Sequence, residues 1–191
     1  MGVTRASIPP AYFEALYAAD PDPWGFVSSD YERAKYDATM AALPAHTFAA
    51  ALEVGCSIGL LARRLARRCA SLLAVDVADA ALAQARARCA GLDHVEIRRL
   101  RIPQEWPDGA FDLILFSEIL YYLSPDDVAR TALRTRAALS PGGAVLLVHY
   151  ILPTDYPCSG DTASEIFIAG AKLAPTLQQR EAQYRLDLLR A

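Results

Sequence analysis

The sequence has little of what marks a metal, redox or disulfide-bonded protein. Its four cysteines form no C-x-x-C pair, and its three histidines are scattered without an H-x-x-x-H spacing. Zinc sites and dithiol redox centres encode their ligands at such short spacings. We therefore expect no metal, and we interpret the cysteines as buried free thiols.

The sequence also lacks a long apolar run and an excess of charge. No stretch reaches the ~18 consecutive apolar residues that span a bilayer, and the N-terminal region has no basic-then-apolar plan of a secretory signal. The formal net charge is only -3, without the basic excess of nucleic-acid-binding domains. We expect a cytoplasmic protein whose partners include neither membrane nor nucleic acid.

The length and composition fit one globular domain. A chain of 191 residues that is 53% hydrophobic can bury a full core, and it contains no internal repeat or flexible linker. We expect a single domain over residues 1–191, as a monomer or homodimer. Residues 1–45 are expected to form a helical lid segment, and residues 46–191 the sheet core.

The order of the apolar segments predicts an α/β fold. Leu- and Val-rich segments alternate with Ala- and Arg-rich segments of helical period, as in βα units that build a parallel sheet. We expect a Rossmann-like, doubly wound, mostly parallel seven-stranded sheet. The expected strands are 50–55, 72–77, 95–100, 111–117 and 144–150, with a terminal hairpin at 176–182 and 184–189.

Helices are expected between these strands. One is predicted over 58–68, and another over 79–90 with Asp79 as its candidate N-cap. A third follows Ser124-Pro125, where a capping serine and a proline suit a helix start. Residues 140–143 read Ser-Pro-Gly-Gly, which predicts a turn before the fifth strand.

The turn after the first strand is the most informative segment. Residues 53–59 read Glu-Val-Gly-Cys-Ser-Ile-Gly, a strand end that leads into a glycine-bearing turn and then a helix. Gly55 and Gly59 lack a Cβ atom, so a ligand can approach the backbone N–H groups there. Asp76 ends the next strand and can accept both hydroxyl hydrogens of a ribose.

Two cofactor classes use such a turn, and the spacing separates them. A dinucleotide fingerprint, G-x-G-x-x-G, requires glycines where this chain has Ser57 and Leu60. The pattern E-x-G-x-G-x-G is matched at Glu53, Gly55 and Gly59, with Ser57 in the middle position. This resembles the first motif of class I methyltransferases that use S-adenosylmethionine (SAM). An NAD(P)-dependent oxidoreductase on the same fold is the disfavoured alternative.

Further motifs narrow the resemblance. Residues 112–123 and 139–143 resemble the fourth-strand motif and the following turn of that superfamily. The chain resembles NodS-like methyltransferases at the following residues: Asp22-Pro23-Trp24-Gly25-Phe26, Tyr31-Glu32, Lys35-Tyr36, Ser117-Glu118, Tyr121-Tyr122-Leu123 and Ser159-Gly160-Asp161. It departs from them at Ala163-Ser164, where such sequences often have Val-His.

The resemblance implies a SAM-dependent methyltransferase that yields S-adenosylhomocysteine. NodS proteins N-methylate the amino sugar at the non-reducing end of a de-N-acetylated chitooligosaccharide, so an amine on a sugar-like or other small-molecule acceptor is implied. A SAM-binding protein without catalysis is the other alternative. The implied cofactor-binding residues are Trp24, Glu53, Gly55, Cys56, Ser57, Gly59, Asp76, Val77, Arg101, Ile102, Ser117 and Glu118.

Catalytic candidates stand where the later strands end. Glu118 follows an apolar run and should face the cofactor crevice, as a general base, a contact of the cofactor ammonium or a structural ion pair. His149 ends the fifth strand on the same edge and suits substrate binding or proton removal, or simply a hydrogen bond at a strand end. Tyr122 is slightly favoured over Tyr121 as a substrate contact. Trp24, Tyr31 and Tyr36 are candidates for a lid over the cofactor, with plain packing of their segment against the sheet as the alternative.

Overall fold

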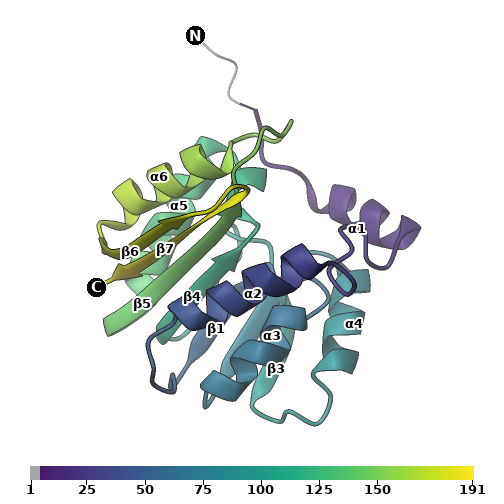
Figure 1. Ribbon diagram of the computed structural model, residues 1–191, viewed down its shortest axis with the longest axis horizontal. Coiled ribbons are helices and arrows are strands. Elements are labelled where there is room, and N and C mark those ends of the chain that lie inside the picture. Colours follow the sequence, from purple (N-terminus) through teal and green to yellow (C-terminus); the bar gives the residue numbers. More distant parts are fainter. Residues whose placement is uncertain (1–4) are drawn as a thin grey trace.

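The computed structural model describes residues 5–191, which form a seven-stranded sheet covered by helices on both faces (Figure 1). Five strands run parallel, β7 is antiparallel to β5, and β6 is antiparallel to β7. This confirms the predicted doubly wound α/β fold. In sheet order the strands are β3 (Val95–Arg99), β2 (Leu72–Asp76), β1 (Ala51–Val54), β4 (Phe111–Ser117), β5 (Leu139–Tyr150), β7 (Tyr184–Arg190) and β6 (Ala174–Arg180).

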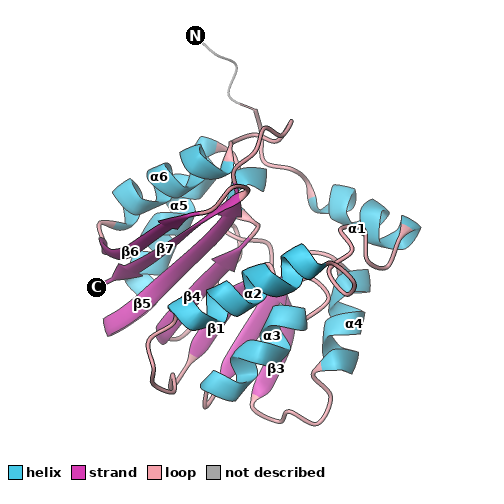
Figure 2. Ribbon diagram, viewed as in Figure 1, coloured by secondary structure: helices cyan, strands magenta, loops and turns pink. Residues whose placement is uncertain are grey.

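The two faces of the sheet pack against different helices (Figure 2). Helices α2 (Asp30–Ala42), α3 (Leu60–Leu65) and α4 (Asp79–Arg88) cover one face, and α5 (Pro125–Ala138) and α6 (Gly160–Ala171) the other. Successive strand residues therefore enter different cores: Ala51 lies in the same core as Leu61 of α3, whereas Leu52 lies in the same core as Val128 of α5. The strands are buried on both sides, which explains their nearly continuous apolar sequences.

Helix α1 (Pro10–Ala19) lies apart from the two layers and packs against α4. The Glu14 side chain accepts a hydrogen bond from the Asp79 N–H at 2.9 Å. The N-cap of α4 is Ala78, which makes no side-chain cap, and Asp79 is the first helical residue. The prediction of Asp79 as an N-cap was therefore wrong, because Glu14 of another helix satisfies that amide.

The predicted start of α5 is confirmed. The Ser124 hydroxyl accepts a hydrogen bond from the Asp127 N–H at 3.2 Å, and Pro125 occupies the first helical position. Asp126 and Asp127 lie in the first turn, where carboxylates stabilise the positive end of the helix dipole.

Two predicted boundaries differ from the structure. Residues 140–143 do not separate helix from strand, since β5 begins at Leu139 and carries them as a bulge between the Phe111–Leu139 and Leu113–Ala144 pairs. The helix predicted over 58–68 is only α3, followed by a short 3-10 helix, Ala66–Arg68. The first difference reflects pairing of β5 with β4, which local sequence does not report.

The prediction of one domain over 1–191 with a lid at 1–45 stays a prediction, and residues 1–4 lie outside the described residues. Within residues 5–191, no helix is both long and apolar enough to cross a membrane. All four cysteines are buried and unpaired in that part of the chain, as expected.

Candidate active site

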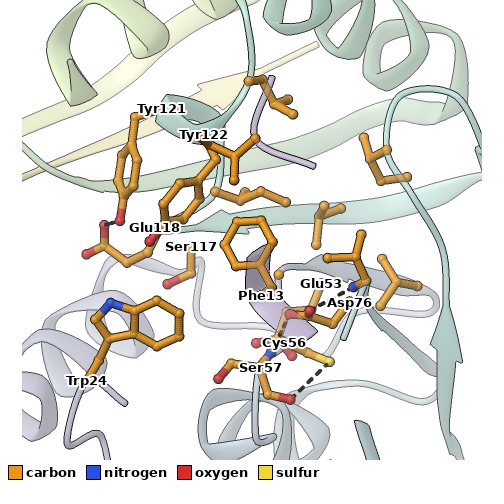
Figure 3. A pocket seen from close by; sticks show the side chains of 18 of the residues that line it. Phe13, Trp24, Glu53, Cys56, Ser57, Asp76, Ser117, Glu118, Tyr121 and Tyr122 are labelled. Atoms are coloured by element: carbon orange, nitrogen blue, oxygen red, sulfur yellow. Dashed lines mark hydrogen bonds between the residues drawn. The ribbon is translucent and has the colours of Figure 1, made fainter. Parts of the chain in front are cut away.

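A pocket of about 320 Å³ opens at the carboxyl ends of β1, β2 and β4. Its floor is made by the residues that follow these strands, including Gly55, Val77 and Glu118. In open α/β sheets, ligands bind at this edge where the strand order reverses, here between β1 and β4. Aromatic residues of the N-terminal segment, including Phe13 and Trp24, line its other side (Figure 3).

The glycine-bearing turn is fixed between β2 and β4. The N–H groups of Gly55 and Cys56 both donate to the Val75 carbonyl, at 2.9 and 3.0 Å. Gly55 has a φ of +85°, and a Cβ there would lie 3.2 Å from the Ser117 carbonyl oxygen. The turn is thus held in one shape, with Gly55, Cys56 and Ser57 lining the pocket.

Gly59 does not line the pocket, although the sequence suggested that it admits a ligand. It is the N-cap of α3 with a φ of +79°, and a Cβ there would lie 2.8 Å from the Cα of Ala85 in α4. In this structure the glycine permits the close approach of two helices, and its contact with a ligand stays a prediction.

Replacing Gly59 with alanine is expected to lower the free energy of unfolding by about 2–5 kcal/mol, from the left-handed φ and the overpacking together. The matched control is Gly91→Ala, which has a φ of +80° and no atom within 4 Å of the added Cβ. It should cost only about 1–2 kcal/mol. Chemical denaturation measures both, and equal losses would contradict the packing role of Gly59.

Two acidic side chains, Glu53 and Asp76, stand at the β1–β2 side of the pocket (Figure 3). Asp76 accepts hydrogen bonds from three backbone N–H groups: Ser57 at 2.9 Å, Val77 at 2.7 Å and Ala78 at 3.2 Å. Burial raises the pKa of Asp76, and these three donors oppose the rise. The carboxylate is therefore oriented by the turns on both sides of it.

Glu53 is less well satisfied. It is 1% exposed, and its Oε2 atom has no hydrogen-bond partner among the described residues. Burial raises the pKa of Glu53 to about 8, with the charge of Asp76 adding to the effect. An unpaired buried carboxylate is costly, so a ligand that brings a donor or a positive charge would be stabilised here.

Glu118 follows β4 at the other side of the pocket and is fully engaged. Its Oε1 accepts a hydrogen bond from the Lys35 ammonium at 2.5 Å. Its Oε2 accepts from the Tyr121 hydroxyl at 3.0 Å and from the Tyr150 N–H at 2.8 Å. Of the three alternatives for this residue, the structure contains the ion pair.

Lys35, on α2, is 3% exposed and also forms an ion pair with Glu32 at 2.9 Å. Burial alone would lower the pKa of Lys35, but the charges of Glu118 and Glu32 outweigh burial and raise it. The lysine is therefore charged and joins α2 to the end of β4. Sequence reasoning did not assign it to the site, although the spacing of Glu32 and Lys35 suits a pair on one helix.

His149 is not brought into the pocket. Its side chain is fully buried, and its Nε2 atom accepts a hydrogen bond from the Leu120 N–H at 3.2 Å. Its Nδ1 atom lies 3.5 Å from the Ser164 hydroxyl of α6. Burial lowers the pKa of His149 to about 3, so the ring is neutral. In this structure the side chain lies beneath α6 and does not line the pocket, and its role in binding a substrate or removing a proton stays a prediction.

The remaining predicted residues line the pocket, as do several that were missed. Arg101, Ile102 and Ser117 lie along it, and so do both Tyr121 and Tyr122, without a distinction between the two. The Tyr122 ring meets Phe13 and Tyr156 edge-on at 4.9 and 4.6 Å between centroids. The missed aromatic lining residues include Phe13, Tyr17, Tyr150 and Tyr156. Only the aromatic content of the N-terminal segment signalled the first two.

The departure from the NodS-like pattern falls outside the pocket. Ala163 and Ser164 are fully buried in α6 and do not line the cavity. Ser164 contacts His149 instead. In this chain, the absence of a histidine at these positions therefore removes no side chain from the pocket.

Comparison with known proteins agrees with this geometry. Residues 14–147 match the family described as Nodulation protein S (NodS). The chain is 34% identical over 128 residues to Nodulation protein S of Rhizobium tropici, covering 66% of this chain and 53% of the relative. It is 32% identical over 127 residues to Nodulation protein S of Sinorhizobium fredii, covering 65% and 59%. The chain thus spans little more than half the length of these curated relatives.

Solved structures give the same result for the fold. A putative methyltransferase from Pseudomonas syringae is 35% identical, with a TM-score of 0.75 over 84% of this chain and 99% of that one. The N-methyltransferase NodS from Bradyrhizobium japonicum, in complex with S-adenosylhomocysteine, has a TM-score of 0.79 at 24% identity over 94% and 96%. The chain therefore belongs to the NodS family and has the Rossmann-like fold of class I methyltransferases.

Proposed function

We propose that the chain is a SAM-dependent methyltransferase that N-methylates an amine on a sugar-like or other small-molecule acceptor. The observation that carries the proposal is the unpaired Oε2 atom of Glu53, buried beside the Gly55 turn and lining the pocket. SAM carries an ammonium group that such an oxygen can receive. Membership of the NodS family supports the same reaction class.

The residues present fit the cofactor from one end to the other. Asp76 is the proposed acceptor for the ribose hydroxyls, since its three backbone donors fix its orientation and leave acceptor capacity. Glu53 is proposed for the ammonium, and backbone groups at Arg101 and Ile102 for the adenine. Trp24 offers an aromatic face to a cationic sulfonium. The pocket volume is within the range of small-molecule sites.

When bound, SAM supplies a methyl group on a sulfonium, which is already activated for transfer. The protein then has to align the acceptor and exclude water. The apolar and aromatic lining serves the second need, and the fixed turn at Gly55 holds the proposed cofactor side of the pocket in one shape. Glu118 is not proposed as a general base, because both its oxygens are occupied by Lys35, Tyr121 and Tyr150.

The two alternatives are less well supported. An oxidoreductase that binds NAD(P) requires a glycine where Ser57 stands, and Ser57 occupies a φ of +50° with its N–H committed to Asp76. A SAM-binding protein without catalysis fits the pocket equally well, so activity has to be measured. The cytoplasmic location and the monomeric or homodimeric state stay predictions.

Glu53 gives the proposal a pH signature. Its pKa of about 8 in the folded protein lies above the ordinary value of 4.5, so burial favours the protonated form. The stability contributed by this group is complete below about pH 4.5, and it is lost as the pH rises from 4.5 through about 8. We expect the free energy of unfolding of the ligand-free protein to fall over this window, by at most about 1.4 kcal/mol per pH unit.

Glu53→Gln should remove that dependence and make the ligand-free protein more stable than wild type at pH 8.5. Urea denaturation at several pH values measures the slope. Glu96→Gln, an exposed glutamate on β3, is the matched control and should leave the slope unchanged. A Glu53→Gln variant with the wild-type slope would contradict the assignment.

The test of the reaction is the formation of S-adenosylhomocysteine from SAM in the presence of primary amines, followed by mass spectrometry. The panel contains amino sugars and simple amines, each paired with its N-acetylated form as control. We expect product with at least one amine and none with the acetylated forms. Binding of S-adenosylhomocysteine without turnover on any amine would favour the non-catalytic alternative.

A further inference from the structure

A second charged cluster lines the pocket at the junction of α2 and β4. Lys35 lies at its centre, with its ammonium 2.9 Å from Glu32 Oε1 and 2.5 Å from Glu118 Oε1. The Tyr31 ring packs over the same ammonium, 5.1 Å from it. Tyr31 and Glu32 precede Lys35 by four and three residues on α2, so both reach the lysine from the preceding turn. All four side chains belong to residues that line the pocket.

The cluster leaves polar atoms unpaired and its charges unbalanced. It holds two carboxyl groups for one ammonium, so it is short of one positive charge when both carboxyls are ionised. Both oxygens of Glu118 are engaged, but the Oε2 atom of Glu32 has no partner among residues 5–191, and Glu32 is only 8% exposed. The Tyr31 hydroxyl is likewise buried without a partner in that part of the chain.

The unpaired atoms define what would complete the cluster. A buried anionic oxygen without a donor is costly, and a ligand nitrogen with hydrogens and a positive charge removes that cost. The Tyr31 hydroxyl, which is also unpaired in the described residues, can accept a hydrogen bond from a ligand nitrogen as well. A neutral or anionic ligand group would leave the cluster short of one positive charge.

This cluster is separate from the acids proposed for the cofactor. In Figure 3, Glu118 and Tyr121 lie on one side of the pocket, and Glu53 and Asp76 lie on the other. The unpaired oxygen of Glu53 is thus available for the cofactor ammonium, whereas Glu32 is linked through Lys35 to Glu118.

We propose that Glu32, together with the Tyr31 hydroxyl, receives the amino group of the acceptor and determines the specificity for amines. Lys35 and Glu118 are positioning residues, because they fix the Glu32 side chain against the end of β4. The inference rests on the proposed function and deepens it by assigning residues to the acceptor end of the pocket.

The test is a titration of protein saturated with S-adenosylhomocysteine, using D-glucosamine and ethanolamine as amine probes and N-acetyl-D-glucosamine as the neutral control. Three variants are compared with wild type. Glu32→Gln keeps an oxygen for Lys35 but removes the charge, and Tyr31→Phe removes only the hydroxyl. Asp30→Asn alters an exposed carboxylate of the same helix that pairs only with Arg33, and it is the matched control.

We expect wild type and Asp30→Asn to bind at least one amine probe and not the acetylated sugar. Glu32→Gln should weaken amine binding by about 10- to 100-fold, as expected for a lost hydrogen bond to a charged group, and Tyr31→Phe by about 10-fold. The affinity for S-adenosylhomocysteine should stay within about 3-fold of wild type, well under 1 kcal/mol.

Three results would overturn the inference. Unchanged amine affinity in Glu32→Gln would remove Glu32 from the acceptor site. An equal loss of S-adenosylhomocysteine affinity in that variant would assign the cluster to the cofactor. Failure of wild type, saturated with S-adenosylhomocysteine, to bind either amine would exclude an amine subsite. Failure of wild type to bind S-adenosylhomocysteine at all is a different outcome, since it would overturn the proposed function itself and the inference with it.

Discussion

Replacing Lys35 with methionine is expected to lower the free energy of unfolding by about 3–5 kcal/mol, because it leaves two buried carboxylates without their counter-ion. The lysine side chain is 3% exposed and holds both Glu32 and Glu118. Methionine keeps the length of the side chain and fits an apolar setting, so the loss reflects charge rather than a cavity. Equilibrium urea denaturation measures it.

The matched control for this variant is Arg33→Met on the same helix. Arg33 pairs with Asp30 at the surface, with both side chains more than half exposed, so its loss should cost less than about 1 kcal/mol. Adding Glu32→Gln and Glu118→Gln to Lys35→Met should restore part of the stability, because no unpaired charge then stays buried. Equal effects of Lys35→Met and Arg33→Met would contradict the account of a buried ion-pair cluster.

Replacing Asp76 with alanine is expected to weaken the binding of S-adenosylhomocysteine by about 10- to 100-fold, since a hydrogen bond to a charged group is lost. The same change removes the acceptor of three backbone N–H groups, those of Ser57, Val77 and Ala78. The turn after β1 should therefore loosen as well, so the ligand-free variant should have a lower melting temperature than the ligand-free wild type.

Asp79→Ala is the matched control, because it removes a nearby carboxylate that lies outside the pocket. Asp79 lies three residues further on, is exposed, and has a contact only to Arg99 at 3.5 Å through its side chain. This variant should bind S-adenosylhomocysteine as wild type does. Isothermal titration of both variants decides the matter: retained affinity in Asp76→Ala would place the ribose elsewhere.

The strands and the glycine-bearing turn could be predicted because their signals are local. Buried parallel strands have nearly continuous apolar sequences, and the turn from Glu53 to Gly59 joins a strand directly to a helix. Asp76 could be placed at the pocket from its position at a strand end alone. Each of these features depends on a few neighbouring residues, so it can be predicted from a single sequence.

The parts that could not be predicted depend on contacts between distant segments. His149 and Tyr150 both end β5, yet successive residues of a strand point to opposite faces. Tyr150 lines the pocket, whereas His149 lies beneath α6, and nothing in the local sequence says which face α6 covers. The choice between the two residues required the three-dimensional packing.

The ion pair between Lys35 and Glu118 was missed for the same reason. The two residues are 83 positions apart, and only the placement of α2 beside β4 brings them together. Sequence left three roles open for Glu118, and the folded chain contains one of them, the ion pair with Lys35. Gly59 belongs to the motif interpreted as ligand-binding, yet its close approach to Ala85 in α4 already requires a glycine, which the sequence does not indicate.

The measurement that tests the central claim most directly is an isothermal titration of the wild-type protein with S-adenosylhomocysteine, with NAD as the parallel ligand. The account predicts saturable heat with S-adenosylhomocysteine and none with NAD, because the turn at Gly55, Ser57 and Gly59 lacks the dinucleotide register. No heat with S-adenosylhomocysteine, together with saturable binding of NAD, would contradict it.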